Sequence, residues 1–142
     1  MRVLRPGKFG RMTVLDAREH GAAADGTTDD HAALWSAISA AHNAGGGTVF
    51  LPAGVYALSQ SLGRTDTDTS RVCLLGDGER ASTLLSTGAF PPIAGLFTGC
   101  RFENLMLDAG GHGGPGLVLD LDKSYVRHCW VRNWTQFGIL LN

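Results

Sequence analysis

The sequence has almost no charge imbalance and no long hydrophobic run. Its 142 residues carry 12 lysines and arginines against 13 aspartates and glutamates, and the formal net charge is −1. Without a basic run, the chain lacks the electrostatic footprint that capture of nucleic acid or of an anionic membrane requires. No segment is apolar for long enough to cross a bilayer or to form a signal peptide. We therefore expect neither nucleic acid nor membrane as a partner.

Cysteine is also scarce. The three cysteines, Cys73, Cys100 and Cys129, stand 27 and 29 residues apart and form no CxxC pair. This spacing argues against a zinc site, and an odd number fits poorly with a disulfide framework. We expect buried free thiols instead.

Glycine, by contrast, is abundant. The 20 glycines lie mostly in pairs and triplets between apolar runs, which is typical of a turn-rich strand protein. Hydrophobic residues make up 44% of the chain and charged residues 18%, which suits one globular domain with its own core. We place this domain at residues 13–142 and interpret residues 1–12 as a flexible arm.

The most informative stretch is a polar turn followed by an amphipathic helix. The helix is expected over about residues 30–43, because apolar side chains recur at i, i+3, i+4 and i+7. Thr28 or Asp29 can cap its first turn, and Gly45 can end it. The apolar positions are Leu34, Ala37, Ile38 and Ala41, and the structural cap that we assign comprises Asp25, Gly26, Thr28, Asp29, Asp30 and Gly47.

Short strands are predicted after the helix, and two of them repeat. Residues 102–107 align with 126–131 at an offset of 24, and residues 116–120 align with 138–142 at an offset of 22. A period in the low twenties with short strands is typical of a parallel β-helix, in which each coil stacks on the previous one. Asn104 and His128 would lie at the bends, and the inward residues would be Phe102, Leu105, Leu107, Val126, Cys129 and Val131.

The rest of the strand pattern is less regular. Strands are expected at residues 48–51, 55–58, 72–75 and 83–85, whereas residues 90–97 look like an irregular connection. The amphipathic helix would lie across the first coil and cover its open core and unpaired edge. The sequence ends inside a coil, so we expect either a continuation of the β-helix or a partner, such as a second and third copy in a homotrimer, to cover that edge.

A family resemblance lies in residues 20–58, which read HGAAADGTTDDHAALWSAISAAHNAGGGTVFLPAGVYAL. They resemble the N-terminal signature of the pectate lyase superfamily, and LLGDGERASTLL at 74–85 resembles its next segment. That superfamily includes pectate lyases, polygalacturonases, rhamnogalacturonases, related epimerases and phage tailspikes. The resemblance covers residues 13–142 and implies an all-β fold: a right-handed, single-stranded parallel β-helix with an N-terminal capping α-helix, truncated after a few coils. It is specific for the fold but not for an activity.

Catalytic residues are incompletely represented. Polygalacturonase-like enzymes use Asn-Thr-Asp, Asp-Asp, Gly-His-Gly and Arg-x-Lys in that order, with paired carboxylates as acid and base. Here Gly-His-Gly occurs around His112, in a glycine loop where chance produces it easily, and the one Asp-Asp lies in the cap. His112 is therefore a candidate catalytic residue, and the alternative is that it is an ordinary residue of a glycine-rich loop. The catalytic residues stay unknown.

Carboxylates suggest a second chemistry. A pectate lyase would hold Ca²⁺ with oxygen ligands and use an arginine as base, and Asp108, Asp120 and Asp122 could gather on one face near Arg132. The alternative is that these are ordinary solvent-facing residues at strand ends. No cofactor is evident otherwise, and we assign no metal site.

Aromatic residues suggest sugar binding. Trp130 alternates with inward Cys129 and Val131, so it should point outward, where its face can pack against a sugar. Trp134 and Arg132 are further candidates for substrate binding. The alternative is that Trp130 shields a subunit or domain contact.

Two functional hypotheses remain open. The first is the N-terminal part of a polysaccharide lyase or glycoside hydrolase that acts on an acidic polysaccharide, with this segment by itself inactive. The second is a non-catalytic β-helix trunk, such as part of a phage tailspike or fibre, that binds glycan or only assembles. Both favour an extracellular or virion-associated location over a cytoplasmic one, without a visible signal peptide.

Overall fold

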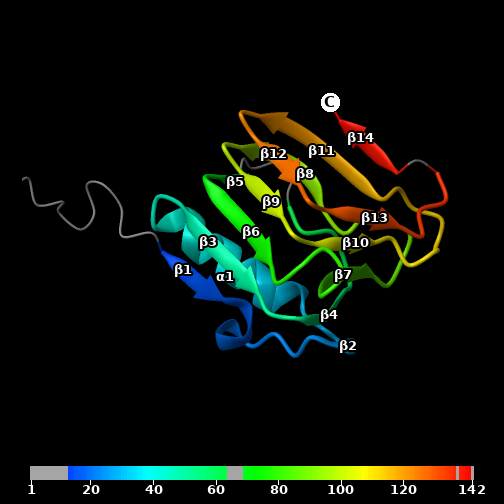
Figure 1. Ribbon diagram of the computed structural model, residues 1–142, viewed down its shortest axis with the longest axis horizontal. Coiled ribbons are helices and arrows are strands. Elements are labelled where there is room, and N and C mark those ends of the chain that lie inside the picture. Colours follow the sequence, from blue (N-terminus) through cyan, green and yellow to red (C-terminus); the bar gives the residue numbers. More distant parts are fainter. Residues whose placement is uncertain (1–12, 64–68, 137, 142) are drawn as a thin grey trace, which may run out of the picture.

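The computed structural model describes residues 13–63, 69–136 and 138–141, and only the backbone of residues 117, 119–121 and 141. The arm expected at residues 1–12 lies outside the described residues. The described chain forms three parallel sheets that it visits in turn, so that each circuit makes one coil of a right-handed parallel β-helix (Figure 1). The all-β prediction with an N-terminal helix is confirmed.

The first two sheets collect one strand from each coil, and the third collects one from each coil after the first. The first sheet has the order β1 (Val14–Asp16), β3 (Gly47–Leu51), β6 (Val72–Gly76), β9 (Arg101–Glu103), β12 (Tyr125–Arg127). The second has the order β13 (Trp130–Arg132), β10 (Met106–Asp108), β7 (Ser82–Ser86), β4 (Gly54–Leu58), β2 (Asp25–Asp29). The third has the order β14 (Ile139–Leu141), β11 (Leu117–Asp122), β8 (Ala94–Thr98), β5 (Thr69–Ser70).

The predicted repeats stack in register. Phe102 pairs with Val126 and Met106 with Trp130, at the offset of 24, while Leu117 pairs with Ile139 at the offset of 22. Asn104 and His128 occupy the bends between the first and second sheets with φ angles of 57° and 51°. All six predicted inward side chains belong to the core or pack against it.

The capping helix α1 (His31–Asn43) covers the first coil, as expected. Its buried side chains are the four predicted ones, and Trp35 packs against the same core. Gly45, at φ 88°, ends the helix, with Gly46 N–H donating to the Ala41 carbonyl oxygen at 2.9 Å. Among the described residues no helix is long and apolar enough to span a membrane.

The carboxylates before the helix tie the cap together. Asp29 Oδ1 accepts hydrogen bonds from the backbone N–H of His31 and of Ser59, both at 3.1 Å, so it caps the helix and joins it to the end of β4. Asp30 is buried and accepts from the N–H groups of Ala23 and Ala24 at 2.7 and 2.9 Å. These hydrogen bonds give both aspartates a structural role.

Two local predictions were wrong. Thr28 does not cap the helix, because its hydroxyl donates to Asp25 at 2.7 Å. The turn predicted at Asp25 and Gly26 is present within the irregular strand β2, where Asp25 Oδ1 accepts from the N–H groups of Thr27 and Thr28 at 2.9 and 2.7 Å and Gly26 has a φ of 79°. Residues 94–98 form strand β8 instead of an irregular connection. Its small residues carry no strand pattern, and pairing with β5 and β11 on either side decides its conformation.

None of the three cysteines, all of them among the described residues, forms a disulfide. Cys73 and Cys100 are buried, and Cys129 is half-buried with its thiol donating to the Phe102 carbonyl oxygen at 3.3 Å. Burial raises the pKa of the Cys73 and Cys129 thiols, which keeps them protonated and unreactive.

Candidate functional site

The outer face of the second sheet carries the candidate site. Strand alternation places Tyr56, Leu84, Leu107 and Val131 toward the core, so the residues on either side of them face outward. One outward row contains Val55, Thr83, Met106 and Trp130, and the next contains Ala57, Leu85, Asp108 and Arg132.

An open groove of about 460 Å³ lies over the first of these rows. The turn before β7 contributes Arg80, whose guanidinium carbon lies 4.0 Å from the centre of the Trp130 ring. The groove is lined by Val55, Arg80, Thr83, Met106, Trp130 and Arg132. The lining contains two arginines and no carboxylate, and because Arg132 is paired with Asp108 beside the groove, Arg80 supplies its net positive charge.

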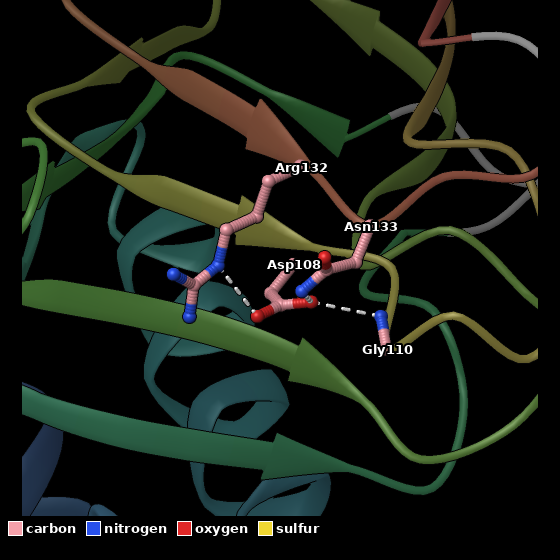
Figure 2. Close-up of polar contacts among 4 residues, drawn as sticks. All are labelled: Asp108, Gly110, Arg132 and Asn133. Atoms are coloured by element: carbon pink, nitrogen blue, oxygen red, sulfur yellow. Dashed lines mark hydrogen bonds and ion pairs between the residues drawn. The ribbon is translucent and has the colours of Figure 1, made fainter.

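Asp108 and Arg132 form an ion pair across adjacent coils, beside the groove (Figure 2). Arg132 Nε donates to Asp108 Oδ2 at 2.8 Å, while Asn133 Nδ2 and the N–H of Gly110 donate to Oδ1, each at 2.9 Å. Burial opposes the ionisation of Asp108, but these three hydrogen bonds outweigh it and hold its pKa below the usual value. Asp108 is therefore a charged anchor held by three donors, and a carboxylate with a lowered pKa is a poor general acid near neutral pH.

The structure separates the other predicted acids from this face. Asp122 is exposed at the end of β11 in the third sheet. Asp120 lies on the same strand opposite Leu96, and its side chain is outside the described residues. His112 is exposed in the connection between β10 and β11. The carboxylates thus do not gather on one face, and the described residues contain no group of three histidine, cysteine or acidic side chains that could hold a metal ion.

The predicted binding residues are only partly brought together. Trp130 points outward with 42% of its surface exposed, and Arg132 lies two residues further along the same strand. Trp134 is exposed in the following connection and does not line the groove. Arg80 was missed, because only the coil register brings the 77–81 turn over a strand 50 residues later in the chain.

Comparison with known proteins places the chain in a family. The family model described as "Rhamnogalacturonase A/epimerase, pectate lyase-like" matches residues 14–110. The chain belongs to this family. This rhamnogalacturonase/epimerase-like chain shares the fold of the A-module of mannuronan C-5 epimerase AlgE4 from Azotobacter vinelandii, with a TM-score of 0.69 and 24% identity over 89% of this chain and 40% of that one.

Two of the sequence relatives come from the same bacterium. The mannuronan C5-epimerase AlgE3 is 47% identical over 67 residues, which is 45% of this chain and 4% of the relative. Alginate lyase 7 is 54% identical over 44 residues, which is 31% of this chain and 5% of the relative. The chain thus spans a small fraction of the length of the curated relatives it matches.

Proposed function

We propose that this chain is the N-terminal part of a β-helix protein that modifies an acidic polysaccharide of the uronate class. The cationic groove over the second sheet carries the proposal. It offers two guanidinium groups over an apolar floor, and sugar rings present C–H faces to apolar and aromatic surfaces. The similarity to a mannuronan C5-epimerase and to an alginate lyase supports the same substrate class.

Within this proposal, the described coils bind the polymer and do not carry out the reaction. Asp108 is neutralised by Arg132, and Asp122 lies on a different sheet. Asp108 and Asp122, the predicted acids whose side chains are described, therefore do not form the pair of carboxylates that acid and base roles need. The cap and first coils would instead align the chain of sugars along the outside of the solenoid.

Affinity electrophoresis tests this function. The purified chain is run through gels containing polymannuronate, polygalacturonate or a neutral galactomannan. We expect retardation by a polyuronate and none by the galactomannan. Equal mobility in all three gels would refute the proposal. A second assay incubates the chain alone with the polymer. Formation of unsaturated sugar ends or of epimerised sugar residues would contradict the proposal that these coils bind the polymer without carrying out the reaction.

A further inference from the structure

The groove contains two arginines whose guanidinium groups are held by different partners. Arg132 uses only Nε to bind Asp108, and Figure 2 shows its two terminal nitrogens pointing away from that carboxylate. The Arg132 side chain is 51% exposed, against 5% for Asp108. Within the described part of the chain, these terminal nitrogens have no hydrogen-bond partner. The ion pair therefore fixes the guanidinium and leaves its donors to a ligand.

Arg80 is held by the Trp130 ring. A guanidinium 4.0 Å above an indole centre gains cation–π stabilisation, and its N–H groups at the edge stay available for hydrogen bonds. This contact also changes the role of Trp130. A ring face that carries a guanidinium supports that cation and is not an open platform for a sugar.

The surroundings of the two arginines favour an oxyanion on a sugar over a free ion. The groove floor includes Val55 and Met106, which suit the C–H face of a pyranose ring, and Thr83 adds a hydroxyl. The groove is open along the outside of stacked coils, so a polymer can pass over it. The groove lining contains no carboxylate, and the nearby Asp108 engages only Nε of Arg132.

We propose that Arg80 and Arg132 form a paired-guanidinium site that binds the carboxylate of one uronate residue in the polysaccharide. The proposal rests on the proposed function and adds the atoms that would recognise the substrate. A sulfate ester on a sugar presents the same oxyanion chemistry, so the experiment includes both.

The test measures binding of hexasaccharides to the whole chain by isothermal titration calorimetry. The probes are hexamannuronate, its carboxyl-reduced counterpart and a sulfated neutral hexasaccharide. The variants are Arg80→Gln, Arg132→Gln and Arg132→Lys, with Arg101→Gln as the control, because Arg101 is exposed on the first sheet. Each variant is first checked by circular dichroism and thermal melting.

We expect each glutamine variant to weaken hexamannuronate binding about 10-fold or more, because a hydrogen bond to a charged group contributes about 1.5–3 kcal/mol. Arg132→Lys should also weaken it, since lysine keeps the charge but loses the planar fork. Arg101→Gln should bind as the unmodified chain does. Arg80 has no carboxylate partner among the described residues, so Arg80→Gln keeps the test valid even if Arg132→Gln destabilises the fold.

The outcomes separate this site from the wider function. Equal binding of the carboxyl-reduced hexamer, or full affinity in both glutamine variants, would overturn the paired site while polysaccharide binding stands. Binding of the sulfated hexamer alone would overturn the uronate assignment. Failure of the folded chain to bind any of the three probes would refute the proposed function together with the site.

Discussion

Asp108 and Arg132 lie at the same register position of adjacent coils, and their charged groups meet at 2.8 Å beside the groove. The pair joins two successive turns of the solenoid through side chains as well as through the backbone ladder. Asn133 and Gly110 donate to the same carboxylate. Asp108 therefore binds two neighbouring residues of the next coil, Arg132 and Asn133, and also the loop that follows its own strand, through Gly110. One buried acid thus serves both the stacking of the coils and the orientation of a surface arginine.

Replacing Asp108 by alanine should lower the free energy of unfolding by about 2–4 kcal/mol, because it leaves an arginine, an amide and a backbone N–H without their partner. Urea denaturation followed by circular dichroism measures the loss. Asp122→Ala is the matched control and should stay within about 0.5 kcal/mol, since this side chain is exposed. An equal loss of unfolding free energy in both variants would show that the hydrogen bonds around Asp108 do not stabilise the fold.

Acid should weaken the fold through the same carboxylate. The pKa of Asp108 is lower in the folded chain than its usual value of 3.8, so the folded state favours the ionised form. The ionised carboxylate therefore stabilises the fold fully when the pH is above the usual pKa of 3.8, and this stabilisation is lost as the pH falls toward the pKa of the folded chain. Unfolding free energies between pH 6 and about pH 2 should therefore fall less steeply for Asp108→Ala than for the unmodified chain. Identical pH profiles would argue against an ionised Asp108.

The helix should be required for folding. Leu34 is fully buried between α1 and the first coil, so Leu34→Asp places an unpaired charge in the core and should cost more than about 4 kcal/mol. Loss of the far-ultraviolet circular dichroism signal would report the unfolding. Ala32→Asp is the control, because Ala32 is exposed in the first helical turn, where a negative charge is favoured. A folded Leu34→Asp chain would mean that the helix does not seal the solenoid.

Replacement by alanine should lower the free energy of unfolding by different amounts at two glycines, Gly76 and Gly45. A methyl group at Gly76 would press on the carbonyl oxygen of Asn104 in the next coil, so Gly76→Ala should cost more than about 2 kcal/mol. Gly45 has a φ of 88° with no atom near its missing side chain, so Gly45→Ala should cost only about 1 kcal/mol in backbone strain. Thermal melting ranks the two variants, and the reverse order would contradict a close approach of the coils at Gly76.

The fold could be predicted because it depends on periodicity. The spacing of Leu34 and Ile38 predicts the helix face, and the offsets of 24 and 22 predict which strands pair. Strand β8 was missed because Ala94 and Gly95 give no alternating pattern, and only pairing with the coils on either side makes them a strand.

The candidate site was harder to predict, because it depends on which residues of neighbouring coils the strand register places side by side. Trp130 was predicted to point outward from its alternation with core residues, and Arg132 was predicted as a further binding residue. Arg80 could not be, since its position over Trp130 follows from the coil register and from the length of a turn. Asp108 was predicted as a candidate catalytic or Ca²⁺-binding carboxylate, but its three donors come from a bend and from the next coil, so its role as an anchor was not visible.

The unequal repeat offsets have a consequence for how this surface can change. Ala109–Gly116, the connection after β10, is two residues longer than Asn133–Gly138, the connection after β13, and this difference accounts for the offsets of 24 and 22. The strands on both sides keep their register despite it. Insertions and deletions at this corner can therefore reshape the rim beside the groove while the hydrogen-bond ladders and the core stay as they are. The corner is the place where natural variation or engineering can alter ligand preference without rebuilding the solenoid.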